Sequence, residues 1–426
     1  MCYASQKLAI DVVKMRILVL NCGSSSVKYR IFVLDGTEEK MLASGMVEEV
    51  GLGSPILIHK RTDGNRLVRT DVKIANHQDA IETVLNVLVD PEWGVLARVQ
   101  DLDAVGHRVV HGGERFASSV LITSEVLEAL YENIPLAPLH NPPNIQGIEA
   151  VRALLPTLPQ VGVFDTAFHQ TMAPAAYLYA IPYRFYQKYG IRRYGFHGTS
   201  HRYVAQEAAR YLNRPLEELK IVTCHLGNGA SVTAVRGGRS VMTSMGFTPL
   251  EGLAMGTRCG DLDPAIIPFL MEKEGLDVEG INRLLNRESG VLGLSELSSD
   301  MRTFEEAIHA GPSHLHYERS VLVLEHYTLR VKKYIGAYAA VMEGLDCVVF
   351  TGGIGENFAE VCEWSCRGLE FLGIRGVRAR PARGEIVEAS TPDSQTKVLI
   401  IPTNEELAIA RDTYEIVTRD QGKPAQ

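Results

Sequence analysis

The chain has 426 residues, of which 46% are hydrophobic and 22% are charged, a composition typical of soluble globular proteins with two or three domains. Its formal net charge of -8 argues against non-specific binding to nucleic acid or to an anionic membrane surface. The seven cysteines are odd in number and include no CxxC pair, which argues against a disulfide framework and a zinc site and indicates a reduced, cytoplasmic protein.

The first fourteen residues, MCYASQKLAIDVVK, lack the long apolar core and the small-residue cleavage site of a secretory signal peptide. No apolar run in the chain is long enough for a membrane-spanning helix. Because the first clear strand begins at Met15, we interpret residues 1–14 as an N-terminal extension. We expect no membrane partner.

Short apolar runs that end in polar or glycine residues alternate with helical patterns along the rest of the chain. The periodicity predicts helices over residues 79–90, 143–155 and 405–417, and buried strands over residues 160–166, 220–226, 346–353 and 397–404. This alternation predicts an α/β fold, in which ligands bind at the carboxyl ends of strands. Proline-rich stretches at 135–144 and 154–160 are candidate hinges, although the first could equally form a rigid wall.

Three glycine-rich loops follow predicted strands: Gly23–Ser26, Gly227–Ser231 and residues 351–357, TGGIGEN. Such loops cradle phosphates because glycine lets the backbone approach a ligand and turn several N–H groups toward it. The chain has no GxxxxGK[ST] motif, and no GxGxxG opens a helix after the first strand, so a nucleotide would be bound by another architecture. Lys28 follows the first loop and is either an exposed surface charge or a phosphate ligand.

The first two of these loops also indicate an internal repeat. Each follows an apolar strand and precedes a second apolar run, and with one gap Gly23 and Val27 align with Gly227 and Val232. A duplicated domain and a chance match between two glycine-rich turns are both compatible with this pattern.

Two further segments combine basic residues with strand or loop patterns. Arg108 lies inside the apolar run of GHRVVHGGERF, where a buried arginine needs an anionic partner, either a structural carboxylate or a substrate. In RRYGFHGTSHRYV, His197 lies in a tight loop and is the better candidate for a site, whereas His201 is readily explained as an early helix residue. Thr199 or Ser200 is the expected N-cap of that helix.

The segment GFTPLEGLAMGTRCGDLDP, residues 246–264, is long, irregular and too apolar for disorder, which is typical of a functional loop. Arg258 is its only cation and could contact an anion.

Acidic residues close two predicted strands. Thr403 and Glu406 match a capping box, so Glu406 has a sufficient structural role. Glu405 and Asp165 are not explained in this way and could face a metal ion. Arginines, loop histidines, strand-end acids and phosphate-type loops together suit phosphoryl transfer, where catalysis is mainly positioning and charge stabilisation.

As a set, these motifs resemble the acetate kinase family. The segments that carry the resemblance occur in family order from about Met15 to the C-terminus: NCGSSSVKY, GHRVVHGG, LHNPPN, FDTAFHQTM, YGFHGTSHRYV, HLGNGAS, GFTPLEGLAMGTRCGDLDP, TGGIGEN and PTNEELAIA. The extension before Met15 is the clearest departure and touches none of them.

The resemblance implies two actin-like (ribonuclease H-like) α/β domains with a duplicated core and an active-site cleft between them. The N-terminal domain would comprise residues 15–165 completed by 402–426, and the C-terminal domain residues 166–401. The implied reaction is a reversible, Mg²⁺-dependent, direct in-line phosphoryl transfer from ATP to acetate, giving acetyl phosphate and ADP, with Mn²⁺ able to replace Mg²⁺. The implied enzyme is a homodimer.

The resemblance also implies roles for individual residues. Asn21 and Glu405 correspond to the magnesium site, and Lys28 to a contact on the nucleotide side. Residues that resemble catalytic ones are Arg108, Asp165, His197, Arg258 and, as a second histidine, His140. Residues that resemble the pocket around the methyl group of acetate are Val110, Leu139, Phe196 and Pro249, beside Arg108, which would hold the carboxylate. Segments that resemble the ATP site are His225, Leu226, Gly227, Asn228 and Gly229; Asp300, Met301 and Arg302; and Gly353, Ile354, Gly355, Glu356 and Asn357.

Elementary chemistry sharpens one of these roles. Acetate is already ionised at neutral pH, so its oxygen needs no general base in order to attack phosphorus. We therefore expect Asp165 to orient the magnesium shell or an arginine rather than to remove a proton.

Three other interpretations remain open from the sequence. One is a sister kinase for propionate or butyrate, because one methylene in a pocket is worth only about 1–3 kcal/mol. The second is a non-catalytic nucleotide-binding switch of the Hsp70 or actin type, which would need the phosphate loops but not the arginine, histidine and apolar-pocket set. The third is a structural protein whose glycine-rich loops are only turns.

Overall fold

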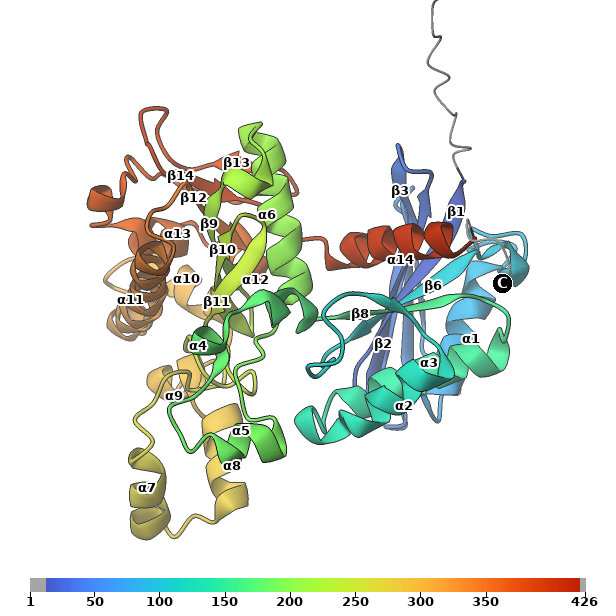
Figure 1. Ribbon diagram of the computed structural model, residues 1–426, viewed down its shortest axis with the longest axis horizontal. Helices are drawn as coiled ribbons and strands as arrows, with labels where there is room; N and C mark the ends of the chain where they lie inside the picture. Colours follow the sequence, from blue (N-terminus) through green and yellow to red (C-terminus); the bar gives the residue numbers. More distant parts are fainter. Residues whose placement is uncertain (1–12, 422–426) are drawn as a thin grey trace, which may run out of the picture. The chain divides into compact units, whose positions relative to one another are not determined.

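The computed structural model describes residues 13–421 and divides the chain into two compact units (Figure 1). Unit 1 runs to Phe164 and resumes at Glu406, and unit 2 runs from Asp165 to Glu405. The expected boundaries, after residue 165 and before residue 402, therefore shift by one and four residues. The reason is local, because the Asp165 carbonyl accepts from Gly198 N at 2.9 Å, and Thr403 N donates to Glu356 at 3.0 Å, both within unit 2. Of the expected extension, residues 1–12 lie outside the described residues.

Within the described residues, unit 1 is built on an eight-stranded sheet of order β5-β4-β3-β2-β1-β6-β8-β7. Strands β5 to β1 pair in antiparallel fashion, β1, β6 and β8 run parallel, and β7 is an antiparallel edge strand. The strand bounds are β1 (Met15–Cys22), β2 (Ser26–Leu34), β3 (Glu39–Glu48), β4 (Ile56–Arg61), β5 (Arg66–Arg69), β6 (Ala104–Val109), β7 (Val120–Leu121) and β8 (Gln160–Phe164).

The centre of strand β1, residues 17–20, is buried on both faces, as its unbroken apolar run predicts. Leu18 and Leu20 belong to a core shared with α1 and α3, whereas Ile17 and Val19 belong to a second core shared with α14. Successive side chains of a strand point to opposite faces, so helices must cover both sides of this sheet. The helix bounds in unit 1 are α1 (His77–Leu88), α2 (Ser124–Glu132), α3 (Asn141–Leu154) and α14 (Glu405–Gln421).

Within the described residues, unit 2 repeats this plan on a six-stranded sheet of order β11-β10-β9-β12-β14-β13. An antiparallel hairpin, β9 and β10, is followed by the parallel strands β12 and β14 and by an antiparallel edge strand β13. The bounds are β9 (Lys220–Leu226), β10 (Ala230–Arg236), β11 (Arg239–Thr243), β12 (Cys347–Thr351), β13 (Val387–Glu388) and β14 (Lys397–Ile400). The order β3-β2-β1-β6-β8-β7 thus recurs as β11-β10-β9-β12-β14-β13, and the predicted duplicated α/β core is confirmed.

The helices of unit 2 cover both faces of its sheet. Helix α6 packs against β9 and β12, and α11 packs against β9 and β10 on the other face (Figure 1). The bounds are α4 (Pro174–Tyr177), α5 (Arg184–Tyr189), α6 (Gly198–Leu212), α7 (Ile266–Glu274), α8 (Val278–Arg287), α9 (Gly290–Ser295), α10 (Met301–Ala310), α11 (Tyr317–Val341), α12 (Gly352–Asn357) and α13 (Ala359–Cys366). In residues 13–421, no helix combines the length and the apolar character needed to cross a bilayer.

The predicted strands and helices are confirmed in type, as β8, β9, β12 and β14 and as α1, α3 and α14. The candidate hinges were wrong, because residues 135–144 and 154–160 lie inside unit 1 and the chain passes between the units elsewhere. Two helix starts also differ from expectation. The residue that precedes α6 is His197, not Thr199 or Ser200, and α14 begins at Glu405, so Thr403 lies too early to be its cap.

Candidate active site

In unit 1 the predicted site residues gather at the carboxyl end of β1. The Arg108 guanidinium Nη1, on β6, donates a hydrogen bond to the Asn21 amide oxygen, on the parallel neighbour β1, at 3.3 Å. Lys28 lies directly opposite Asn21 in the β1–β2 register, and its side chain is exposed. The structure thus places the proposed magnesium, substrate and nucleotide contacts of this unit side by side, although they come from three strands.

Two asparagines that the sequence reasoning missed hold this strand end in place. Asn144 donates from Nδ2 to the Cys22 carbonyl at 2.7 Å and accepts from Val110 N at 3.0 Å, while Asn141 accepts from His111 N at 3.2 Å and donates to the carbonyl of the same residue at 3.0 Å. Both side chains are buried. An amide carries both donor and acceptor, so it can satisfy strand ends whose backbone groups no longer have a ladder partner. The sequence signal that could have indicated this role is HNPPN, which places two asparagines on the first turn of a helix.

The remaining predicted residues of unit 1 have different exposures. Val110 is buried at 7% exposure, whereas Leu139 is 69% exposed. His140 immediately precedes α3 and is exposed as well. Of the two residues of unit 1 that were expected to line the small apolar pocket, therefore, only Val110 is buried.

In unit 2 the backbone of His197 is held in the left-handed region, with φ of 57°. This conformation is unfavourable for a residue with a side chain, at a cost of about 1–3 kcal/mol, and such residues cluster at functional sites. The next residue fixes the turn, because Gly198 N donates to the Asp165 carbonyl at 2.9 Å and α6 begins there. The loop position predicted for His197 is confirmed.

The His197 ring lies over the β9–β10 hairpin loop. Its Nδ1 is 2.9 Å from Ser231 Oγ, and its ring stacks on His225 with centroids 4.2 Å apart. A methyl group placed on Gly229 would lie 3.5 Å from Nε2 of His197 and 3.7 Å from Nη1 of Arg258. The structure therefore brings His197, His225 and Arg258 together at the glycine-rich loop.

Arg258 belongs to the irregular segment 246–264, where its Nη1 donates to the Pro249 carbonyl at 3.3 Å. Burial lowers the pKa of its guanidinium below the ordinary value, yet arginine keeps its charge in proteins. A partly buried cation of this kind is favourable only where an anion compensates it.

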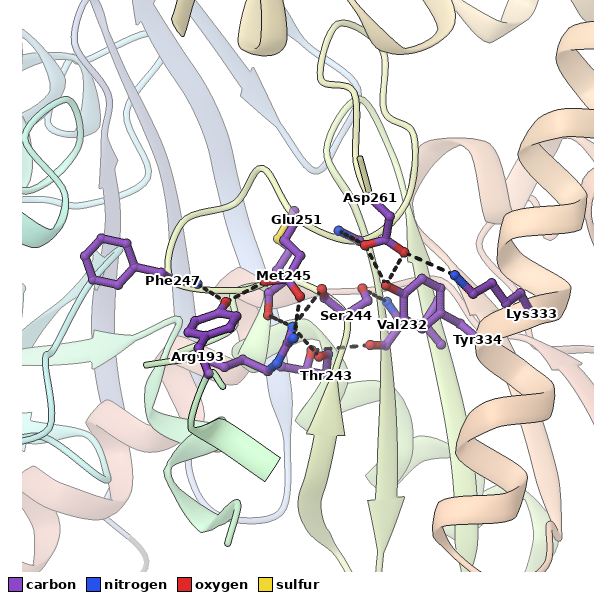
Figure 2. Close-up of polar contacts among 12 residues, drawn as sticks. Arg193, Val232, Thr243, Ser244, Met245, Phe247, Glu251, Asp261, Lys333 and Tyr334 are labelled. Atoms are coloured by element: carbon purple, nitrogen blue, oxygen red, sulfur yellow. Dashed lines mark hydrogen bonds and ion pairs between the residues drawn. The ribbon is translucent and has the colours of Figure 1, made fainter. Parts of the chain in front are cut away.

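Buried polar contacts fix the shape of this segment (Figure 2). Arg193 Nη1 donates to the carbonyls of Thr243, Ser244 and Met245 at 3.1, 3.0 and 3.0 Å, and its Nη2 forms a short ion pair with Glu251. No local pattern in the sequence indicates this role for Arg193.

The far end of the same segment is held by Asp261. Its Oδ1 accepts from Gly252 N at 3.1 Å, and its Oδ2 accepts from the Tyr334 hydroxyl on α11 at 2.9 Å (Figure 2). The chain between Glu251 and Asp261, which carries Arg258, is therefore attached at both ends to well-packed elements.

The segments expected to bind ATP have structural contacts of their own. The HLGNG loop closes through Gly227 N donating to the Gly229 carbonyl at 3.0 Å. Glu356 Oε1, on α12, accepts from Gly352 N at 2.9 Å and from Thr403 N at 3.0 Å, so this carboxylate connects the start of α12 to the segment before α14. If Glu356 also contacts a ligand, it must therefore use hydrogen-bonding capacity that these two backbone N–H donors leave free.

In the segment DMR, Asp300 is the N-cap of α10, and its carboxylate accepts from the backbone N–H of Arg302 at 3.0 Å. The Arg302 side chain folds back onto the same carboxylate and is 80% exposed. Met301 is buried.

The two predicted acids, Asp165 and Glu405, lie near residues Thr199 and Thr403. Asp165 is 1% exposed, and Thr199 Oγ1 donates to its Oδ1 at 3.4 Å. Glu405 is half-buried at the first position of α14, two residues after Thr403, whose hydroxyl contacts Ser200 Oγ at 2.8 Å. Phe196 is buried, and its carbonyl accepts from His169 Nε2 at 3.0 Å.

A separate group of metal-type ligands lies elsewhere on unit 2. Among residues 13–421, the cluster of three such side chains is Glu305, His309 and Glu360, on α10 and α13. His309 Nε2 and Glu360 Oε1 are 2.7 Å apart, and His309 is exposed, so a surface hydrogen bond accounts for this contact of the cluster.

Comparisons with known proteins show which proteins have a similar sequence and fold. A sequence model described as the acetokinase family matches residues 16–411. The acetate kinase of Desulfitobacterium hafniense is 55% identical over 406 residues, covering 95% of this chain and all of that protein. A crystal structure of Porphyromonas gingivalis acetate kinase superposes with a TM-score of 0.89 at 48% identity, covering 95% of this chain and all of that one. A propionate kinase from Francisella tularensis superposes with a TM-score of 0.84 at 39% identity, covering 94% of this chain and all of that one.

Proposed function

This chain belongs to the acetokinase family and is a kinase, and on that premise we propose that it transfers the γ-phosphoryl group of ATP to acetate, giving acetyl phosphate and ADP. The observation that carries the proposal is the convergence of His197 and Arg258 on the glycine-rich loop at Gly229. A histidine, an arginine and a phosphate-type loop at one point are the groups that a transferring phosphoryl group needs.

The proposed reaction is an in-line displacement. A carboxylate oxygen of acetate forms a bond to the γ-phosphorus, the bond from that phosphorus to the β–γ bridging oxygen breaks, and ADP leaves with the electron pair. No proton is taken up or released at the attacking oxygen, because acetate is already ionised. The chain's own contribution is to orient the two substrates and to stabilise the negative charge on the equatorial oxygens.

We assign the acetate carboxylate to Arg108 and the transferring phosphoryl group to Arg258 and His197. Guanidinium groups bind carboxylate and phosphoryl oxygens through two parallel hydrogen bonds, which fixes geometry as well as charge. The hydrogen bond from Arg108 to the Asn21 amide supports this assignment, because it orients the guanidinium with a neutral group. His140 is retained as a second, more exposed histidine of the substrate side.

ATP is assigned to Lys28 and to the segments 225–229, 300–302 and 353–357. The equivalent positions of the β1–β2 and β9–β10 hairpins in the two sheets support two phosphate-binding loops. Within these segments we expect backbone groups to make most contacts, because the carboxylates of Asp300 and Glu356 are already hydrogen-bonded within the protein.

Magnesium is the metal that the family implies, and the chemistry of the candidate residues fits it. Asn21 offers an amide oxygen and Glu405 a carboxylate, and hard oxygen ligands of this kind are the ones that Mg²⁺ takes in phosphate sites. When bound, the ion would neutralise charge on the β- and γ-phosphates.

Asp165 is assigned an orienting role. It is nearly fully buried, and Thr199 donates to its carboxylate. If it orients the magnesium shell or an arginine, Asp165→Asn should weaken the dependence of activity on Mg²⁺ and leave the shape of the kcat–pH profile unchanged. A basic limb of the profile that disappears in Asp165→Asn, with the affinity for Mg²⁺ intact, would instead identify Asp165 as a base.

Acetate is preferred over longer acids in this proposal, with Val110, Leu139, Phe196 and Pro249 as the pocket residues. Val110 and Phe196 are buried, which suits a small apolar wall. The similarity to a propionate kinase favours propionate as the second candidate substrate. Because one methylene is worth only about 1–3 kcal/mol, the preference is expected to be about 10- to 200-fold at most.

The test is steady-state kinetics of the full chain with ATP and Mg²⁺, supplying acetate, propionate and butyrate in parallel and trapping acyl phosphate as the hydroxamate. The highest kcat/KM with acetate would support the proposal, and a clear preference for propionate would keep the reaction and change the substrate. No acyl phosphate from any of the three, in a protein whose melting temperature still rises with ATP, would refute it in favour of a nucleotide-binding switch.

A homodimeric state is also proposed. Leu322 and Leu329 lie seven residues apart on α11 and are 45% and 62% exposed, and Leu315, in the turn before the helix, is 88% exposed. These exposed apolar side chains support a contact with a second copy. Sedimentation of wild type and Leu329→Glu tests it, and a wild type that sediments as a monomer at micromolar concentration would contradict it.

The unpaired state of the six described cysteines supports the proposed cytoplasmic location.

A further inference from the structure

His201, which the sequence explained as an early helix residue, lies fully buried beneath the proposed site in unit 2. Both of its ring nitrogens have hydroxyl partners: Nδ1 is 2.7 Å from Thr223 Oγ1, and Nε2 is 2.7 Å from Ser231 Oγ. Ser231 Oγ is in turn 2.9 Å from Nδ1 of His197. A continuous chain of hydrogen bonds therefore runs from the core of the sheet to the catalytic candidate.

The His201 ring stays neutral. Burial lowers its pKa well below the ordinary value, and the neighbouring rings of His169 and His225 act in the same direction. A neutral imidazole has a single N–H, so one of its nitrogens donates and the other accepts. The direction of every hydrogen bond in the chain then follows from the direction of any one of them.

Thr223 fixes that direction. Its hydroxyl also lies 3.4 Å from the carbonyl oxygen of Thr233, a group that can only accept. A hydroxyl has one hydrogen, so a Thr223 that donates to this carbonyl must accept from His201 Nδ1–H. His201 Nε2 then accepts from the Ser231 hydroxyl, and Ser231 Oγ accepts from His197 Nδ1–H.

We propose that Thr223, His201 and Ser231 are positioning residues that hold His197 as the tautomer with its proton on Nδ1. This inference rests on the proposed function. With Nδ1–H committed to Ser231, His197 can take up a further proton only at Nε2, the atom that lies with Arg258 over Gly229. His197 then stabilises the transferring phosphoryl group as a cation with an N–H donor, which is a stronger interaction than a neutral hydrogen bond.

The surroundings of His197 keep this arrangement in place. Its ring stacks on His225 at 4.2 Å and an interplanar angle of 28°, which opposes the ring flip that would exchange the two nitrogens. His225 is itself held through Nδ1 by Ser200 Oγ at 2.8 Å. The ionisable groups of unit 2 that face the ring include His225, His201 and Arg258.

If every hydrogen bond from Thr223 to His197 ran in the reverse direction, each ring nitrogen in the chain would still have a partner. Thr223, however, would then have no hydrogen to donate to the Thr233 carbonyl. In that case neutral His197 would carry its proton on Nε2. The two directions therefore predict opposite tautomers of one residue, which nuclear magnetic resonance distinguishes directly.

The experiment uses the full chain labelled with ¹⁵N-histidine and long-range ¹H–¹⁵N correlation at about pH 8.5, where histidine side chains are ordinarily neutral. The signals that vanish in His197→Gln identify the residue. The wild type is expected to show the Nδ1–H pattern for both His197 and His201. An Nε2–H pattern for wild-type His197 would overturn the inference, and this readout requires no variant to be active.

Thr223→Val then tests the chain from its far end, because it preserves shape and does not touch His197. Without the hydroxyl acceptor, His201 should turn its proton to Nε2 and His197 should become the Nε2–H tautomer, with kcat falling about tenfold and each KM staying within about twofold. Thr233→Val is the matched control, since it removes a hydroxyl from the opposite strand of the same hairpin, one that contacts Thr243 instead. It should keep the wild-type tautomer and kcat.

An unchanged tautomer of His197 in Thr223→Val would overturn the inference, as would an equal effect of Thr233→Val. Absence of acyl phosphate formation by the wild type would refute the proposed function instead, and the tautomer measurement would still decide the direction of the hydrogen bonds.

Discussion

Replacing Arg193 by methionine is expected to destabilise unit 2 strongly and to impair the proposed site, although Arg193 contacts no predicted site residue. The change removes one donor atom shared by three backbone carbonyls and breaks the ion pair with Glu251 (Figure 2). The Arg193 side chain is only 12% exposed, so water cannot replace these contacts, whereas Glu251 is 34% exposed and partly recovers hydration.

Loss of one partner of a buried ion pair costs about 3–5 kcal/mol, and the partial exposure of Glu251 places this pair near the lower limit, at about 3 kcal/mol. For a unit of this size such a loss lowers Tm by about 6–12 °C. Because the segment that carries Arg258 is attached through Glu251, we also expect kcat/KM for acetate to fall about tenfold or more at temperatures where the variant is folded.

Differential scanning calorimetry and acyl phosphate kinetics measure both effects, and Arg283→Met is the matched control. Arg283 also forms an ion pair in unit 2, with Glu288, but the two side chains are 58% and 51% exposed, so its loss should cost less than about 1 kcal/mol. A double-mutant cycle with Glu251→Gln should give a coupling of about 1–3 kcal/mol. Equal Tm values for Arg193→Met and Arg283→Met would refute the reasoning.

Three further predictions concern substitution and pH. Arg108→Lys and Arg258→Lys should each lower kcat/KM about 100-fold or more with Tm unchanged, because lysine cannot donate two parallel hydrogen bonds; activity within a few-fold of wild type would contradict the assigned roles. Burial lowers the pKa of His107 to about 4, below its unfolded value, so its contribution to stability is present above about pH 6.5 and is lost as pH falls toward 4. Urea unfolding of His107→Asn should therefore show a weaker loss of stability over that range than wild type, and parallel curves would exclude this cause. Gly352→Ala should destabilise unit 2, because φ is +80° and the methyl would lie 2.7 Å from the backbone of β9, whereas Gly353→Ala, with open space around it, should not; equal Tm values would contradict this.

The parts of the fold that the sequence made predictable are those specified by local patterns. Buried parallel strands such as 347–351 are continuous apolar runs because both faces are covered, and their ends were visible as glycine or polar residues. The repeat of the Gly23 and Gly227 loops was visible for the same reason, since each loop connects two such runs. The sequence left open whether this repeat was a duplication or a chance match. The equivalent strand orders of the two sheets then showed that the core is duplicated.

The contacts that hold the site could not be read locally because they join residues far apart in the chain. Asn144 contacts Cys22 across 122 positions, and Arg193 contacts Glu251 across 58. The sequence shows only that an asparagine or an arginine is present, and such residues are usually exposed. His201 is the clearest example, because its helix position offered a sufficient explanation until the structure placed it between two hydroxyl groups.

In the proposed reaction, an acetate oxygen becomes bonded to the γ-phosphorus of ATP. The most direct measurement is ³¹P nuclear magnetic resonance of the products formed from ATP and acetate labelled with ¹⁸O in both carboxylate positions. For this transfer we expect an acetyl phosphate signal displaced by one ¹⁸O atom bonded to phosphorus, with ADP and residual ATP unlabelled. Acetyl phosphate without the isotopic displacement, or ADP formation with no acyl phosphate at all, would contradict it.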